Sequence, residues 1–158
     1  MITAFCLVTG LTLPGQTGTP LALRSREVRM NLFGQLQKGF YSVMAGEYDA
    51  AQVTSTLQDA IARRPCLMYS DSQCPTCLKA KNLLNTLGTM KTVVDLDELE
   101  EGMAMRAELI PITSTSALPA VFIGGKFVGD YDAMADLHRV GKLKELLTQA
   151  GALAKDRV

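Results

Sequence analysis

A Cys-Pro-Thr-Cys motif at residues 74–77 constrains this chain most, because of what stands on either side of it. The residues before it, 65–69, form a short apolar run that predicts a β-strand. The leucines after it recur at helical spacing on one face, until Gly88 ends the segment. These leucines are Leu78, Leu83, Leu84 and Leu87. A strand, a turn with two cysteines and a helix, in this order, predict a thiol–disulfide redox protein.

The predicted helix start gives the two cysteines different roles. Pro75 suits the first helical position, where its missing amide proton costs nothing, so Cys74 directly precedes the helix. The free amides of the first turn and the helix dipole then favour the thiolate and lower the pKa of Cys74 from the free value of about 8.5. Cys77 lies one turn further in, close enough to attack a mixed disulfide on Cys74. We expect Cys74 to be the nucleophile and Cys77 the resolving cysteine.

A zinc half-site is the alternative for two cysteines at this spacing. A structural zinc site needs a second pair of Cys or His ligands. The rest of the chain offers only Cys6, Cys66 and His138, and none of them is paired at ligand spacing. We therefore expect redox chemistry and no metal.

The charge balance and aromatic content argue against several classes of partner. The 158 residues include 16 acidic and 16 basic side chains and no tryptophan, so the chain has no basic field and few stacking platforms for nucleic acid. No stretch approaches the roughly 20 continuous apolar residues that span a bilayer. We expect a monomer that binds neither nucleic acid nor membranes.

The first 45 residues differ in composition from the remainder. Glu27 is their one acidic residue against four basic ones, and Gly, Pro and Thr cluster between Gly10 and Pro20. No core-forming pattern is present. We expect an N-terminal extension, residues 1–45, that is disordered or a targeting segment, ahead of a domain at residues 46–158. The expected location is the cytoplasm, or an organelle (mitochondrion or plastid) if the extension is a presequence.

After residue 46 the predicted helices and strands alternate along the chain. The helices cover about 47–64, 75–87, 97–109 and 132–150, and the strands 65–69, 92–96, 121–123 and 126–128. Pro111 is expected to end the third helix, and Gly124-Gly125 suits the two-residue turn of a hairpin. A helical crossover makes the first two strands parallel, and the hairpin adds an antiparallel pair. The sequence predicts an α/β fold with a small mixed four-stranded sheet flanked by helices.

Three separated motifs resemble the glutaredoxin family of the thioredoxin fold. They are the Cys-Pro-Thr-Cys motif, Leu118-Pro119, and the Phe-Ile-Gly-Gly-Lys-Phe-Val-Gly stretch at residues 122–129. The resemblance spans about residues 47–153 and implies a thioredoxin-like fold. It also implies an enzyme, a glutathione-dependent thiol–disulfide oxidoreductase with glutathione as co-substrate. Its partners would be glutathionylated or disulfide-bonded proteins, whose mixed disulfides it reduces.

The resemblance further implies a glutathione-binding site. Pro119 would follow a cis peptide bond, and the backbone of Leu118 would pair with the glutathione backbone. The loop Asp130-Tyr131-Asp132 would receive a glutathione carboxylate at a helix start, where free amides bind anions. Thr76, within the Cys-Pro-Thr-Cys motif, would also contact glutathione. Arg106 matches a polar family position that reaches a carboxylate; a solvated helix charge is the alternative interpretation of Arg106.

Two acidic residues depart from the family pattern. Asp71 stands where the family usually has a lysine, three residues before the nucleophile, and Asp130 replaces a glycine of the carboxylate loop. Negative charge at these places opposes glutathione binding and thiolate formation.

The C-terminal half is most similar to plant glutaredoxins of the CC type. These are known as adaptors of transcription factors through a Leu-x-x-Leu-Leu element, which residues 143–147 match. The alternative function is therefore a catalytically weak adaptor that regulates a partner such as a transcription factor. Core packing of an amphipathic helix is the other explanation of these leucines.

Overall fold

The structure is a computed structural model that describes the backbone of residues 21–153 and the side chains of residue 32 and residues 34–153. The helices and strands in this part of the chain are α1 (Leu21–Ala45), α2 (Ala50–Arg63), β1 (Cys66–Ser70), α3 (Pro75–Thr86), β2 (Thr92–Asp95), the 3-10 helix η1 (Leu96–Glu98), α4 (Gly102–Thr113), β3 (Ala120–Ile123), β4 (Lys126–Gly129), α5 (Tyr131–Arg139) and α6 (Lys142–Gln149). The prediction of a presequence concerns in part residues 1–20, which lie outside the described residues, as does Cys6.

The four strands form one mixed sheet in the order β2-β1-β3-β4. Strands β1 and β2 are parallel and joined through α3, whereas β1 with β3 and β3 with β4 are antiparallel pairs. The hairpin turn consists of Gly124 and Gly125, whose φ angles of 57° and 79° suit a two-residue turn. The predicted α/β fold with a four-stranded mixed sheet is confirmed.

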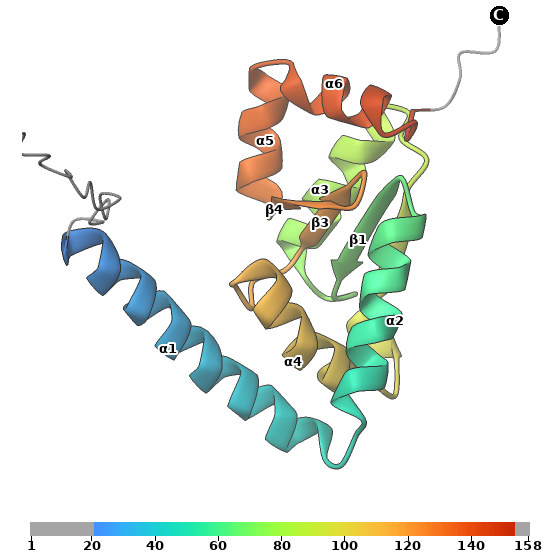
Figure 1. Ribbon diagram of the computed structural model, residues 1–158. Coiled ribbons are helices and arrows are strands. Elements are labelled where there is room, and N and C mark those ends of the chain that lie inside the picture. The colour runs from blue at the N-terminus through green and yellow to red at the C-terminus, as the bar shows by residue number, and fades with distance from the viewer. Residues whose placement is uncertain (1–20, 154–158) are drawn as a thin grey trace, which may run out of the picture.

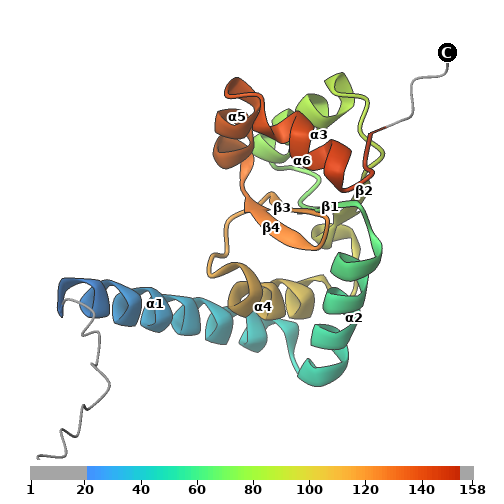
Figure 2. The same cartoon turned by 45° about the horizontal axis from the view of Figure 1, so that its top comes forward.

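Helices cover both faces of the sheet (Figures 1 and 2). Helices α3, α5 and α6 pack on one face, and α2 and α4 pack on the other. Alternate side chains of β1 divide between these layers, with Cys66 and Met68 toward α3 and with Leu67 and Tyr69 toward α2 and α4. All five residues of β1 are buried, so the continuous apolar run before the dicysteine motif belongs to a central strand.

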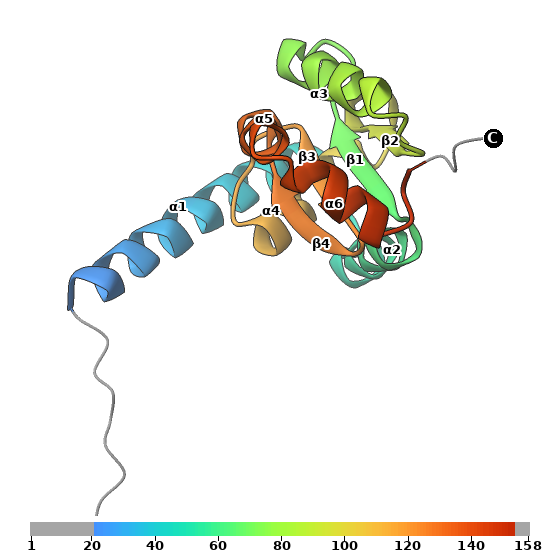
Figure 3. The same cartoon turned by 90° about the horizontal axis from the view of Figure 1, so that it is seen from above.

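Helix α1 lies against α4, and its N-terminal half projects away from the rest of the structure (Figures 1 and 3). The sequence analysis found no core-forming pattern in this segment, whereas the structure has a helix over residues 21–45. The physical reason lies in the contacts, because Lys38, Tyr41 and Ser42 meet other residues through polar and aromatic interactions. The spacing of hydrophobic residues in the sequence gives no indication of polar and aromatic contacts of this kind. In the part of the chain that the structure describes, no helix is long and apolar enough to cross a membrane.

Three helix boundaries differ from the sequence prediction. Pro111 lies inside α4 and does not end it at once, since the helix continues for less than one turn, to Thr113. The chain turns instead at Ser114, whose φ is 59° and whose amide donates to the carbonyl of Ile110 at 2.7 Å. This α4 also begins later than predicted, after the short helix η1. The single final helix is two helices, because Gly141 takes a φ of 76° between α5 and α6.

Candidate active site

Cys74 lies at the turn between β1 and α3, where it is the N-cap residue of α3. Its Sγ accepts a hydrogen bond from the Cys77 amide at 3.3 Å, and Pro75 occupies the first turn of the helix. An N-cap side chain normally accepts such a bond through oxygen. Here the sulfur takes that place, so the partial positive charge of the helix start is directed at it.

Thr76 supplies a second polar contact to this sulfur. Its Oγ1 lies 3.0 Å from Cys74 Sγ and 3.4 Å from the carbonyl oxygen of Leu118. The sequence analysis expected Thr76 to bind glutathione and missed this contact. In the sequence, a hydroxyl residue two positions after the N-cap residue is the feature that predicts such a contact. Thr76 therefore links the nucleophile to the loop before β3.

The two thiols of the motif have opposite pKa shifts. Burial opposes ionisation of Cys74, but hydrogen bonds from Cys77 and Thr76 outweigh it, so the pKa of Cys74 lies below its ordinary value. Burial raises the pKa of Cys77 to about 12, and the hydrogen bond with Cys74 adds to the effect. Cys77 is fully buried, whereas Cys74 is half-buried, and both are free thiols. Cys74 is the cysteine that reaches the thiolate state first.

The Leu118–Pro119 peptide bond is cis, as the family resemblance implied. Pro119 is fully buried, and the carbonyl oxygen of Leu118 lies 4.0 Å from Cys74 Sγ. The main chain of Leu118 therefore lies directly beside the sulfur, where an extended peptide backbone can meet it.

The loop at residues 130–132 opens helix α5. Asp130 is the N-cap, and its Oδ1 accepts from the Ala133 amide at 3.1 Å. The preceding Gly129 has a φ of 129°, and a Cβ there would lie 2.6 Å from that of Ala133, so only glycine fits. Tyr131 packs on the core cluster that also holds Cys74 and Leu118, whereas Asp132 is exposed.

Lys79 is a cation beside this loop that the sequence analysis did not single out. Its Nζ lies 5.9 Å from the centre of the Tyr131 ring, and the residue is exposed. Its position two residues after Cys77, on the first turns of α3, is the signal that places it near the motif.

Arg106 is a partly buried residue that forms an ion pair. Its Nη1 lies 2.8 Å from Asp71 Oδ2, and the two side chains are only 20% and 25% exposed. The guanidinium carbon also lies 5.0 Å from the centre of the Tyr41 ring in α1. The two residues that the sequence analysis treated separately, one as a glutathione ligand and one as an unfavourable charge, are thus partners of each other.

Cys66 takes no part in this site. It is fully buried in β1, and burial raises its pKa to about 11, which makes its thiol inert. Among the side chains that the structure describes, no group of three or more His, Cys, Asp or Glu residues could hold a metal ion.

The Leu-x-x-Leu-Leu element in α6 packs into the core. Leu143 and Leu147 are fully buried, and Leu146 is partly buried against the same cluster.

In α3, by contrast, Leu78 is 60% exposed and is not on the buried face as predicted, because Cys77, Ala80 and Leu84 face the sheet.

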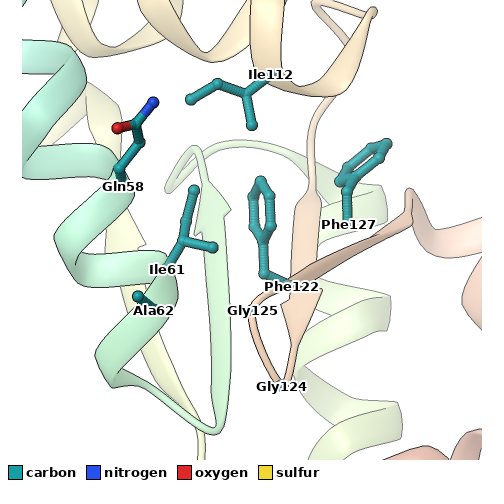
Figure 4. A pocket seen from close by; sticks show the side chains of 8 residues that line it. All are labelled: Gln58, Ile61, Ala62, Ile112, Phe122, Gly124, Gly125 and Phe127. Carbon is teal, nitrogen blue, oxygen red and sulfur yellow. The ribbon is translucent and has the colours of Figure 1, made fainter.

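A pocket opens on the other side of the sheet, between α2, the end of α4 and the β3–β4 hairpin (Figure 4). Apolar side chains line most of it, including Ile61, Ile112 and Phe122, and Gln58 is the polar side chain at its rim. It contains no nucleophile or titratable group, so we assign it no chemistry.

Comparison with known proteins places this site in a family. The glutaredoxin family profile matches residues 66–128. A glutaredoxin of Solanum lycopersicum is 41% identical over 98 residues, which cover 62% of this chain and 91% of the relative. The chain belongs to the glutaredoxin family. Glutaredoxin-C2 of Arabidopsis thaliana is also 41% identical, over 88 residues that cover 56% of this chain and 79% of the relative.

Solved glutaredoxin structures share the fold. A buckwheat glutaredoxin–glutathione complex has a TM-score of 0.65 at 33% identity, covering 66% of this chain and 96% of that one. Oxidised glutaredoxin 2 from Chlamydomonas reinhardtii has a TM-score of 0.63 at 39% identity, covering 67% of this chain and all of that one (100%). This glutaredoxin is therefore a thiol–disulfide oxidoreductase with the thioredoxin fold. Each of these two structures leaves about a third of this chain unmatched.

Proposed function

We propose that this glutaredoxin reduces glutathione mixed disulfides of proteins through its Cys-Pro-Thr-Cys motif, with Cys74 as the nucleophile and Cys77 as the resolving cysteine. The observation that carries the proposal is the environment of Cys74. Its sulfur sits at the start of α3, accepts from the Cys77 amide, contacts Thr76 and has a lowered pKa. The thiolate is the species that attacks disulfides, and a lowered pKa increases its fraction.

The reaction consists of two thiol–disulfide exchanges. In the first, the Cys74 thiolate attacks the glutathione sulfur of a protein–glutathione disulfide, forms a Cys74–glutathione disulfide and releases the protein thiolate. In the second, the thiolate of another glutathione attacks the glutathione sulfur of that disulfide, forms oxidised glutathione and returns the Cys74 thiolate. Alternatively, Cys77 loses its proton to solvent and attacks Cys74, which releases glutathione and leaves a Cys74–Cys77 disulfide.

Glutathione is the co-substrate, and the geometry around Cys74 supports a place for it. The backbone of Leu118, held by the cis bond to Pro119, lies beside the sulfur and is suited to pair with the peptide. The amides at the start of α5 suit a glutathione carboxylate, with Tyr131 and Asp132 in that first turn. A buckwheat glutaredoxin has been solved with glutathione, which supports this assignment.

The Asp71–Arg106 ion pair balances the charge of one of the two acidic residues that depart from the family pattern. Asp71 alone would repel a thiolate and an anionic peptide, but Arg106 pairs with it at 2.8 Å. Arg106 then balances the charge of Asp71 next to the place proposed for glutathione. Asp130 caps α5, which accounts for its presence at a position where the family has glycine.

For partners and location we propose glutathionylated or disulfide-bonded proteins, acted on by a monomer. The cytoplasm is the proposed location, with an organelle as the alternative. A relative from Oryza sativa named Glutaredoxin-C4, chloroplastic, is 35% identical over 97 residues, covering 61% of this chain and 73% of that protein, which supports the alternative.

The adaptor function draws less support from the structure. A partner cannot reach Leu143 or Leu147 of the Leu-x-x-Leu-Leu element while both are fully buried. An adaptor acting through α6 would have to bind its exposed polar residues.

Glutathione-dependent reduction of a small mixed disulfide by the full chain, coupled to glutathione reductase, tests the proposal. We expect turnover that Cys74→Ser abolishes and Cys77→Ser retains, because a second glutathione can replace Cys77. Equal loss in both variants would indicate a dithiol mechanism. No turnover by the folded wild-type chain would overturn the proposal.

A further inference from the structure

Arg106 lies between helix α1 and the loop that carries the nucleophile. Asp71 of the loop binds the guanidinium on one side at 2.8 Å, and the Tyr41 ring of α1 lies 5.0 Å from it on another. The Nε of Arg106 is buried and has no hydrogen-bond partner. Two contacts from separate elements therefore fix the side chain, and one of them comes from outside the region that the family profile matches.

A buried carboxylate anchors the part of α1 that carries Tyr41. Glu108 of α4, 5% exposed, accepts hydrogen bonds from Lys38 Nζ at 2.8 Å and from Tyr48 Oη at 3.0 Å. Thr54 Oγ1 also donates to it at 3.3 Å, and Ser42 bonds to the Tyr48 hydroxyl at 3.0 Å. Lys38 and Ser42 flank Tyr41 on α1, so these bonds set the register of α1 on α4.

Asp71 contacts the nucleophile through its backbone, and its charge adds to the raised pKa of the neighbouring Cys77. Asp71 is three residues before Cys74, and its carbonyl oxygen accepts from the Cys74 amide at 3.3 Å. An unpaired carboxylate here would favour the neutral thiol, and an adjacent guanidinium opposes that effect. The other carboxylate bonded to this loop is Asp97, which accepts from the Ser72 amide at 2.9 Å.

We propose that Tyr41 is a positioning residue for the redox reaction: it holds Arg106 on Asp71, and the neutralised carboxylate then permits the Cys74 thiolate. A cation over an aromatic face gains attraction that strengthens when water is excluded, as it is around this partly buried guanidinium. The inference rests on the proposed role of Cys74 as the nucleophile and extends the site to α1.

The rate of Cys74 alkylation by iodoacetamide, followed against pH in the full chain by mass spectrometry, tests the proposal without glutathione. We expect Tyr41→Leu, which removes the π face but keeps the bulk, to lower the rate at acid pH by about threefold, with convergence toward the wild-type rate at alkaline pH. Tyr41→Phe retains the ring and should match the wild type. Leu36→Ala, at a 66% exposed position on the same helix, is the matched control.

A second variant tests the same charge without disturbing α1. Asp71→Asn leaves Arg106 without its anion, so the alkylation rate at acid pH should rise above that of the wild type. When Asp71→Asn is already present, Tyr41→Leu should no longer lower the alkylation rate, because the effect of Tyr41 depends on the charge of Asp71. A merely structural role of Tyr41 would change unfolding but not this pH profile.

An unchanged profile in folded Tyr41→Leu, or a shift of equal size in the Asp71→Asn background, would overturn the inference. An unchanged acid-pH rate in Asp71→Asn would also overturn it. Failure of the proposed function would appear separately, as absent glutathione turnover in a wild-type chain whose Cys74 still reacts with iodoacetamide.

Discussion

The ammonium group of Lys38 in α1 lies 2.8 Å from the carboxylate of Glu108 in α4, which is 5% exposed. A buried carboxylate that loses its cation is left with an uncompensated charge, which is strongly destabilising. Residues that the sequence analysis assigned to an extension thus contribute to the structure of α4. A chain beginning at residue 46 would lack both Lys38 and Ser42.

We expect Lys38→Met to lower the free energy of unfolding by about 1 to 2 kcal/mol, less than for a fully buried pair because Lys38 itself is 37% exposed. Urea unfolding followed by circular dichroism measures the change. In a Glu108→Gln background the same substitution should cost much less, since no buried charge remains. An equal loss in both backgrounds would mean that Lys38 stabilises α1 independently of Glu108.

Thr76→Val should raise the pKa of Cys74, because it removes a hydroxyl that contacts the sulfur at 3.0 Å. A hydrogen bond to a charged group contributes about 1.5 kcal/mol or more when shielded, and exposure of Thr76 reduces this. We therefore expect Cys74 to react with iodoacetamide roughly threefold to tenfold more slowly at acid pH. Thr76→Ser keeps the hydroxyl and should behave like the wild type.

The alkaline limit distinguishes this explanation from a steric one. Above both pKa values the thiolate is fully formed, so wild type and Thr76→Val should react at similar rates there. A constant difference across the whole pH range would indicate that valine obstructs the reagent and that the hydroxyl does not stabilise the thiolate.

Much of the fold follows from local patterns in the sequence. The apolar run of β1, the glycines of the hairpin, Leu84 of α3 and the leucines of α6 each fix an element through burial or backbone conformation. The helix boundaries that were predicted wrongly lie where two backbone conformations are close in energy. A helix can continue past Pro111 once its earlier turns are packed, and Gly141 can either stay helical or turn.

The candidate site was predictable as far as its chemistry lies within one segment. Cys74, Pro75 and Cys77 are neighbours in sequence, so the N-cap geometry could be inferred from their spacing. The Asp71–Arg106 pair joins residues 35 apart, and Tyr41 is even further from Arg106 in the sequence. No periodic pattern encodes a pairing between an ion pair and a distant ring, because it depends on how α1 docks on α4.

Asp95 at the end of β2 should make stability depend on pH. Its partial burial opposes ionisation, but Lys81 at 2.7 Å and the Ser70 hydroxyl outweigh this and hold the pKa of Asp95 below its ordinary value. A carboxyl whose pKa is lower in the folded state stabilises the fold above its unfolded pKa, about 3.9, and loses that contribution as the pH falls through the folded pKa.

Asp95→Asn should therefore reduce the free energy of unfolding by about 1 kcal/mol at neutral pH, a value discounted because both partners are 23% exposed. The difference from the wild type should shrink in acid, where the wild-type carboxyl is protonated. Urea unfolding at neutral and acid pH measures both. A difference that stays constant with pH would show that the amide disturbs packing and that charge is not the cause.

Asp130 combines two effects that one substitution can separate. Its Oδ1 caps α5 through the Ala133 amide at 3.1 Å, which stabilises the helix. Its charge lies at the helix start that we propose for a glutathione carboxylate, where it opposes an anion. Serine is also a good N-cap but is neutral. We expect Asp130→Ser to lower the KM for glutathione about twofold to fivefold with little change in stability, as a screened surface charge permits.

Asp130→Ala is the matched control, because it removes the same charge together with the cap. It should cost about 1 kcal/mol of stability, so that thermal unfolding distinguishes it from Asp130→Ser. If glutathione binds at the start of α5, the decrease in KM caused by Asp130→Ser should become smaller as salt is added. Salt screens the charge of Asp130, which is the charge that the substitution removes. An unchanged KM in a stable Asp130→Ser variant would place the glutathione carboxylate elsewhere, and Lys79, beside Tyr131, is then the cation to substitute next.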